Sequence, residues 1–171
     1  MILPLVFVDA NVFIYARDPR EPRKEARARQ WLAGLWRERT GRTSALVLAE
    51  FYAVVTRKLA QPVPEELAWD DVTRYLAWRP RAIDEAVLHL ARETSQRFAL
   101  GWWDSLLVAA AKLQGCSVLL TDELKDGLAF GTLGVRNPFT LEATEPLARY
   151  EVTHHVAPLH RPRGRPKRVA A

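Results

Sequence analysis

Residues 2–11 read ILPLVFVDAN, an apolar run that ends at Asp9-Ala10-Asn11. A run without polar alternation is typical of a strand buried on both faces, as at the centre of a parallel sheet. Ligands of such sheets bind beyond the carboxyl ends of the strands, so the pattern places Asp9 where chemistry is usually done. Asp9 could also cap the helix expected from Val12, and the two roles are compatible.

Further along the chain, apolar residues at helical spacing alternate with short apolar runs. We expect helices over residues 12–16, 23–39, 48–59, 65–78, 84–98 and 102–113, and strands over 43–47, 79–83 and 117–120, with an added edge strand in the segment through Asn137-Pro138-Phe139. Strands separated by helices predict right-handed crossovers and a parallel sheet, which is the α/β class.

The composition indicates one domain and a reducing environment. The chain has 171 residues, of which 49% are hydrophobic, and its formal net charge is +5. Much of the positive excess lies in the last dozen residues, so it says little about the folded part. A single cysteine, Cys116, cannot form an internal disulfide. The first apolar run is too short for a signal peptide, and no later run reaches membrane-spanning length, so a cytoplasmic location is expected.

Acidic residues follow two of the predicted strands and begin two of the predicted helices. Asp9 and the pair Asp122-Glu123 come after strands, whereas Glu50 and Asp104 interrupt apolar helical stretches in first turns. An isolated buried carboxylate must be paired, neutralised or bound to a metal, and no Lys or Arg interrupts those stretches. A hard cation such as Mg²⁺ is the simplest compensating charge. Glu50 could instead belong to a buried ion pair or mark a helix start.

With these motifs in their order, the chain resembles the PIN-domain nucleases, and especially the VapC-like toxins of prokaryotic toxin–antitoxin pairs. The resemblance spans about residues 5 to 139. It rests on Phe7-Val8-Asp9-Ala10-Asn11-Val12, Ala49-Glu50-Phe51, Trp103-Asp104-Ser105-Leu106-Leu107-Val108-Ala109-Ala110-Ala111, Leu119-Leu120-Thr121-Asp122-Glu123-Leu124 with Asp126-Gly127, and Asn137-Pro138-Phe139.

The resemblance implies a three-layer α/β/α sandwich with a central parallel sheet, dependence on Mg²⁺ or Mn²⁺, and endoribonuclease activity. It implies that Asp9, Glu50 and Asp104 are metal-binding acids and that Asn11 and Thr121 are supporting polar groups; Ser105, next to Asp104, joins them. The fourth acid of the family usually lies two residues after the Thr. Here Glu123 holds that position and Asp122 precedes it. We favour Asp122 for its shorter side chain and keep Glu123 as a metal ligand.

Beyond residue 145 the sequence departs from the family, which predicts a nuclease domain over 1–145 and a basic tail over 146–171. The segment His160–Arg168 is rich in Arg, Pro and Gly, and Arg163-Gly164-Arg165-Pro166 resembles an AT-hook. The tail could contact the minor groove of DNA, attract phosphates generally, or be a solvated end. Candidate nucleic-acid-binding residues are Arg163, Arg165, Lys167 and Arg168.

The expected function is metal-dependent hydrolysis of RNA by a toxin that a small antitoxin protein restrains. Exposed apolar helical residues, such as Leu67 and Trp69 with Val72 and Leu76, could serve a homodimer or an antitoxin contact. Trp102 and Trp103 are interpreted as packing residues. Two alternatives stay open. One is a non-catalytic nucleic-acid-binding module, and the other is a phosphatase of the haloacid dehalogenase type, which needs a second Asp where this chain has Asn11.

Overall fold

A computed structural model describes residues 3–140 and the backbone of residues 154–155. Its sheet has the strand order β2-β1-β3-β5-β4-β6. The strands are β1 (Val6–Val8), β2 (Gly41–Arg42), β3 (Val118–Leu120), β4 (Leu128–Phe130), β5 (Leu133–Arg136) and β6 (His154–His155). All neighbouring pairs are parallel except β4 with β5. The predicted boundary at residue 145 and the rest of the tail lie outside the described residues.

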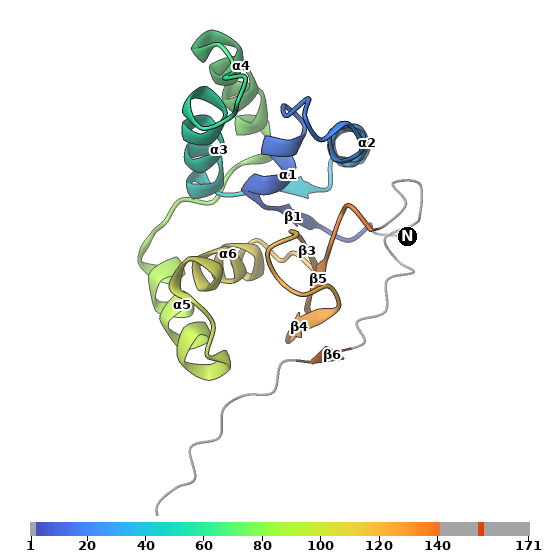
Figure 1. Ribbon diagram of the computed structural model, residues 1–171. Helices are drawn as coiled ribbons and strands as arrows, with labels where there is room; N and C mark the ends of the chain where they lie inside the picture. The colour runs from blue at the N-terminus through green and yellow to red at the C-terminus, as the bar shows by residue number, and fades with distance from the viewer. Residues whose placement is uncertain (1–2, 141–153, 156–171) are drawn as a thin grey trace, which may run out of the picture.

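Helices flank the sheet. They are α1 (Ala10–Tyr15), α2 (Pro22–Glu38), α3 (Ala45–Arg57), α4 (Glu65–Tyr75) with the short 3₁₀ turn η1 (Leu76–Trp78), α5 (Glu85–Phe98) and α6 (Trp102–Leu113). Figure 1 shows α1 to α4 grouped in its upper part and α5 with α6 at lower left, with strands β1, β3, β5 and β4 following one another beside them. The predicted α/β class with helices around a central parallel sheet is confirmed, and the β4–β5 pair is the antiparallel exception.

The connections change direction at β1. From β1 the chain crosses to β2 on one side, and later it returns to β3 on the other side, with Val8 opposite Leu120. Both strands are fully buried, which explains their continuous apolar sequences. Such a switch point opens a crevice at the carboxyl ends of the two strands. Asp9 follows β1 and Thr121 follows β3, so both lie at this crevice.

Three predicted strands differ from the structure. The strand expected over residues 43–47 is displaced to Gly41–Arg42, because the Ser44 hydroxyl accepts a hydrogen bond from the Val47 N–H and thereby starts α3. Residues 79–83 contribute one bridge, between Arg81 and Ser44, and no strand. The segment before Asn137 forms two strands, and β5 lies inside the sheet between β3 and β4 rather than at an edge.

Candidate active site

One buried hydroxyl joins the ends of β1 and β3. The Thr121 Oγ1 donates to Asp9 Oδ2 at 2.8 Å, and it accepts from Asn11 Nδ2 at 3.0 Å and from the Glu123 N–H at 3.1 Å. The other Asp9 oxygen, Oδ1, accepts from the Ala10 N–H at 2.7 Å, so Asp9 also caps α1. The two roles that the sequence left open for Asp9 therefore occur together, and Thr121 supports it as predicted.

The amide oxygen of Asn11 lacks a hydrogen-bond donor in the part of the chain that the structure describes. Asn11 is buried, and its Oδ1 is a buried acceptor without a hydrogen bond among the described residues. A buried acceptor without a donor is costly, because it loses its water and gains nothing in return. This oxygen lies in the same hydrogen-bonded group as Asp9, which points to a cation or a water molecule as its missing partner.

The Asp9 carboxyl is buried among other acids. It is 3% exposed, and its pKa is raised from 3.8 to about 7, chiefly by burial and further by the charges of Glu123 and Glu50. The hydrogen bonds from Thr121 and Ala10 oppose this shift without cancelling it. Asp9 is therefore poised to ionise near neutral pH, and a nearby cation would favour its charged form.

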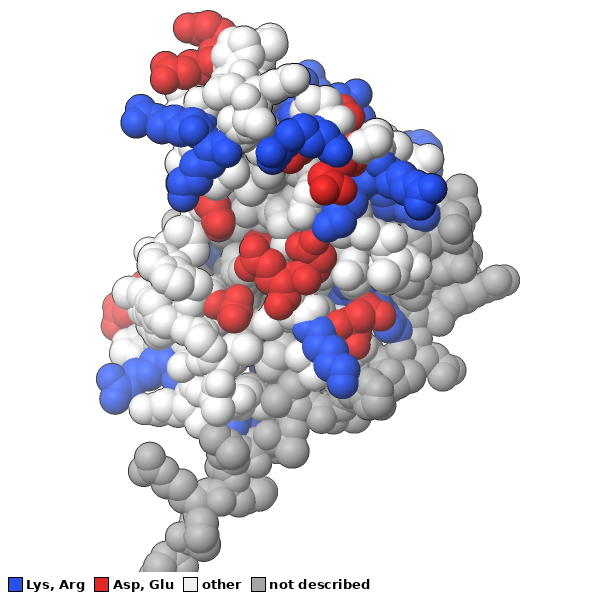
Figure 2. All heavy atoms as spheres, viewed as in Figure 1, with Lys and Arg blue, Asp and Glu red and all other residues white. Residues whose placement is uncertain are grey.

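Four further acids, Glu50, Asp104, Asp122 and Glu123, share this electrostatic environment. Burial raises the pKa of Asp104. The pKa of Glu123 is raised by partial burial and by the charges of Glu50, Asp104 and Asp122. Figure 2 shows acidic side chains gathered near the middle of one face, with Lys and Arg on several sides of them. The structure thus brings acids from the end of β1, from α3, from α6 and from the segment after β3 close enough for their charges to act within one group.

Two residues differ from their sequence interpretation. Glu50 lies in the second turn of α3 rather than the first, and it is exposed rather than buried. It therefore needs no ion partner, and it influences the site by its charge on Asp9 and Glu123. Trp102 and Trp103 are 44% and 65% exposed, so within the described residues they are not core residues. Ser105 is buried and donates to the Gly101 carbonyl at 2.8 Å, which gives it a local role in starting α6.

Asp122 and Glu123 face different surroundings. The Lys24 ammonium of α2 approaches Asp122 Oδ2 to 3.4 Å and donates to the Tyr15 hydroxyl at 3.0 Å. Asp122 is therefore partly neutralised by a protein cation, whereas Glu123 faces acids. Sequence reasoning missed Lys24 because it lies in a helix rich in Arg and Glu that is typical of a solvated surface. Its contact with Tyr15, nine residues earlier and on another helix, is not one that helical periodicity could predict.

The ligand chemistry of this group fits a hard divalent cation. It offers carboxylate oxygens, an orphaned amide oxygen at Asn11 and excess negative charge, and Mg²⁺ prefers oxygen ligands. In the described part of the chain, no three His, Cys, Asp or Glu side chains are grouped so that they could together hold a metal ion. The ligand atoms and the charge of this group therefore suit the cation, but the side chains do not form a complete coordination shell.

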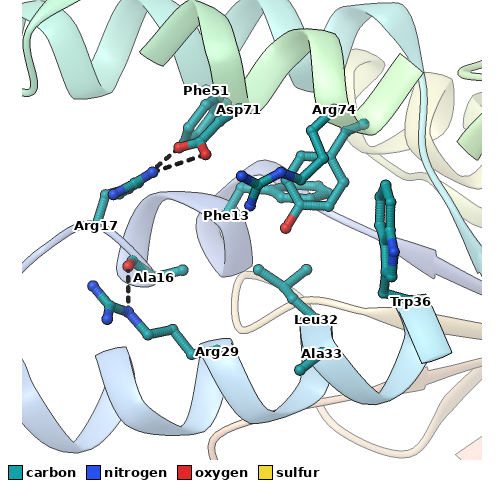
Figure 3. Close-up of a pocket in the computed structure, with 11 residues that line it drawn as sticks. Phe13, Ala16, Arg17, Arg29, Leu32, Ala33, Trp36, Phe51, Asp71 and Arg74 are labelled. Carbon is teal, nitrogen blue, oxygen red and sulfur yellow. Dashed lines mark hydrogen bonds and ion pairs between the residues drawn. The ribbon is translucent and has the colours of Figure 1, made fainter. Parts of the chain in front are cut away.

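A separate cleft of about 540 Å³ lies between α1, α2, α3 and α4. Figure 3 shows an apolar floor that includes Phe13 and Leu32, and arginines that include Arg17 at its margin. Arg17 makes two bonds to Asp71, at 2.7 and 2.8 Å. Asp9 caps the start of α1, and Ala16 and Arg17, which follow its end, line this cleft, so the cleft and the acidic group lie at opposite ends of one short helix.

The tail residues Arg163, Arg165, Lys167 and Arg168 lie outside the described residues. In the part that is described, none of the helices has the length and apolar character needed to cross a membrane.

Comparisons with known proteins identify the family. Among solved structures, the chain is similar to VapC20 of Mycobacterium tuberculosis, a toxin that cleaves the sarcin-ricin loop, with 17% identity and a TM-score of 0.46; the match covers 67% of this chain and 86% of that chain. No curated protein matches. The PIN domain family model matches residues 6–125, which is well over half of the chain and includes all the acids described above. The chain belongs to the PIN domain family.

Proposed function

We propose that the protein is a divalent-metal-dependent endoribonuclease that hydrolyses RNA phosphodiester bonds. The observation that carries this proposal is the burial of Asp9 at the β1–β3 crevice beside other acids. Burial chiefly, and the charges of Glu123 and Glu50 further, raise its pKa to about 7. Membership of the PIN domain family supports it. A module that only bound RNA would gain nothing from gathering negative charge where a polyanion must dock, so a binding role without catalysis is the weaker candidate.

The residues that would hold the ion are Asp9, Glu50, Asp104 and Glu123. Bound there, Mg²⁺ or Mn²⁺ supplies a Lewis acid that polarises a phosphate oxygen and lowers the pKa of a water molecule. Thr121 holds the Asp9 carboxylate in place, and Asn11 presents its Oδ1 without a competing protein donor. Because Asp9 lies 3% exposed, it adopts one orientation before substrate arrives.

The proposal is tested with a labelled single-stranded RNA in Mg²⁺, Mn²⁺ or EDTA. We expect cleavage with either metal, products that carry a 5′ phosphate, and none in EDTA. Asp9→Asn and Asp104→Asn should abolish cleavage while thermal unfolding stays cooperative, and Asp70→Asn, at an exposed acid of α4, is the matched control. Full metal-dependent activity in either site variant would refute the assignment, and RNA binding without cleavage by the wild type would favour the binding module.

We propose that Glu123 is the fourth metal-binding acid. The sequence analysis favoured Asp122 for its shorter side chain. Glu123 is the acid whose pKa responds to Glu50 and Asp104, whereas Asp122 faces Lys24. Glu123→Gln should therefore reduce cleavage by an order of magnitude or more, since such groups act as a unit. Asp122→Asn should have the smaller effect. A larger loss of RNA cleavage in Asp122→Asn than in Glu123→Gln would identify Asp122 as the fourth acid instead.

We also propose that a small antitoxin protein restrains the enzyme. The cleft between α1 and α4 has an apolar floor and an arginine margin, which suits an amphipathic segment that carries acids. Ala33 is exposed at this cleft, so Ala33→Trp should fill it and weaken the partner while RNA cleavage persists. Co-expression with a candidate antitoxin tests this: equal inhibition of the variant and the wild type would exclude the cleft as the contact.

A further inference from the structure

Lys24 is held in one position by groups from three parts of the chain. Its ammonium lies 4.2 Å from the centre of the Tyr15 ring and 5.2 Å from that of Phe139. The Tyr15 hydroxyl accepts a hydrogen bond from it at 3.0 Å, and Asp122 Oδ2 lies at 3.4 Å. The side chain of a lysine on a helix surface normally samples many rotamers, and fixing it in one of them costs conformational entropy. Here aromatic rings and two oxygens hold it, so its charge has a defined place.

The ammonium retains capacity to bind another group. A lysine has three N–H donors, and two acceptors face it among the described residues, one of them at the long distance of 3.4 Å. The side chain is 36% exposed, so solvent or a ligand can reach it. Its hydrogen bond with Tyr15 and the charge of Asp122 raise its pKa, which keeps it protonated throughout the physiological range. A protonated, partly exposed and fixed ammonium is suited to a phosphate oxygen.

Lys24 also lies where an RNA substrate needs a positive charge. It contacts Asp122, whose charge in turn acts on Glu123, so it stands at the margin of the acidic group. Two arginines that line the cleft at the other end of α1 are each paired with an acid. Arg17 is paired through two bonds with Asp71, and Arg29 contacts Glu25 at 2.6 Å.

We propose that Lys24 binds a backbone phosphate of the RNA next to the bond that is cleaved, as a residue that positions the substrate. The inference rests on the proposed nuclease function and adds to it a phosphate subsite on α2. The Tyr15 and Phe139 rings and Asp122 prepare this subsite by fixing the ammonium. Loss of the charge should therefore weaken binding and raise KM, and it should change kcat by less than about twofold because Lys24 does not act on the reacting atoms.

The test is the salt dependence of RNA binding by the full-length chain. Binding of a fluorescein-labelled oligouridylate is measured by anisotropy in the Asp9→Asn background with Mg²⁺, which prevents cleavage. One phosphate contact contributes about 0.7 to the slope of log affinity against log salt for a single strand. Between about 0.15 and 1 M salt this corresponds to roughly fourfold in affinity. Lys24→Gln should lower the magnitude of the slope by about 0.7, so that the RNA affinities of the variant and its parent converge at high salt. Lys24→Arg, which keeps the charge, should retain most of the parent's slope.

Arg37→Gln provides the matched control. Arg37 lies on the same helix, its side chain is 78% exposed, and its loss changes the net charge equally. We expect its slope to equal that of the wild type. An unchanged slope for Lys24→Gln, or an equal drop for Arg37→Gln, would overturn the proposal, because the first shows no phosphate contact and the second shows a general charge effect.

Two further readouts separate the possible failures. Thermal unfolding of each variant shows whether the pairing of Lys24 with Asp122 matters for folding, since a purely structural role would lower the melting temperature and leave the salt slope unchanged. Cleavage assays of the Lys24 variants with an intact Asp9 give KM and kcat. Cleavage by the wild type with an unchanged Lys24→Gln slope refutes the subsite alone, whereas a lowered slope in a protein that never cleaves RNA refutes the nuclease function and leaves the phosphate contact.

Discussion

Replacing Asp9 by Asn should make the metal-free protein more tolerant of high pH. The folded-state pKa of Asp9 is about 7, against 3.8 for an unperturbed carboxyl, and burial is the main cause. Because the folded pKa is raised, the group's contribution to stability is fully present below about pH 4 and is lost as the pH rises through 7. Three pKa units correspond to roughly 4 kcal/mol in the free energy of unfolding. Asn carries no charge, so the variant avoids this loss.

The substitution also has a cost that does not depend on pH. An Asn side chain can accept from the Ala10 N–H or from the Thr121 hydroxyl, but its amide nitrogen cannot accept the other bond. The lost bond costs about 1–3 kcal/mol at every pH. We therefore predict that the variant has a lower free energy of unfolding than the wild type near pH 4. Between pH 4 and 8 the wild type loses about 4 kcal/mol relative to the variant, so the variant becomes the more stable protein at pH 8.

Urea denaturation followed by circular dichroism, in EDTA and at intervals between pH 4 and 8, measures this difference. Asp84→Asn is the control, and its stability difference from the wild type should change little between pH 4 and 8. The Val87 N–H, and next the Arg81 side chain, lower the pKa of Asp84, so its contribution is present above its unfolded pKa and lost as pH falls. Added Mg²⁺ at pH 8 should stabilise the wild type and not Asp9→Asn. A stability difference for Asp9→Asn that stays constant with pH would refute the reasoning that burial suppresses its ionisation.

Two other predictions concern the stability of the scaffold around the site. Thr121→Val removes the hydroxyl that joins Asp9 to its neighbours and should lower the free energy of unfolding by about 1–3 kcal/mol, measured by urea denaturation; an unchanged value would mean that the hydrogen bonds contribute nothing. Gly41→Ala would place a Cβ 2.5 Å from atoms of the Trp78 ring and should cost about 1–3 kcal/mol. Gly34→Ala is its matched control, since nothing lies within 4 Å and a helical position should gain about 0.5–1 kcal/mol; a loss there as large as at Gly41 would contradict the steric explanation.

Local pattern was enough to predict the elements that carry the site. The apolar runs of β1 and β3 and the predicted helix over residues 102–113 are all present, since the two buried strands and the buried middle of the helix, residues 106–111, are continuously apolar. The position of Asp9 after β1 followed from the same run. The short strand β2 was misplaced because its two residues carry too little pattern, and the cap at Ser44 determines where α3 begins.

Other properties depend on residues that are distant in the chain, and periodicity does not contain them. Whether Asp122 or Glu123 faces the other acids depends on Lys24, which is 98 residues away from Asp122. The pKa of Asp9 depends on burial and on charges from Glu50 and Glu123. Residue type and spacing were enough to predict which acids belong to the site. Adjacent side chains can point into opposite environments, however, so only tertiary packing determines which charges surround each acid.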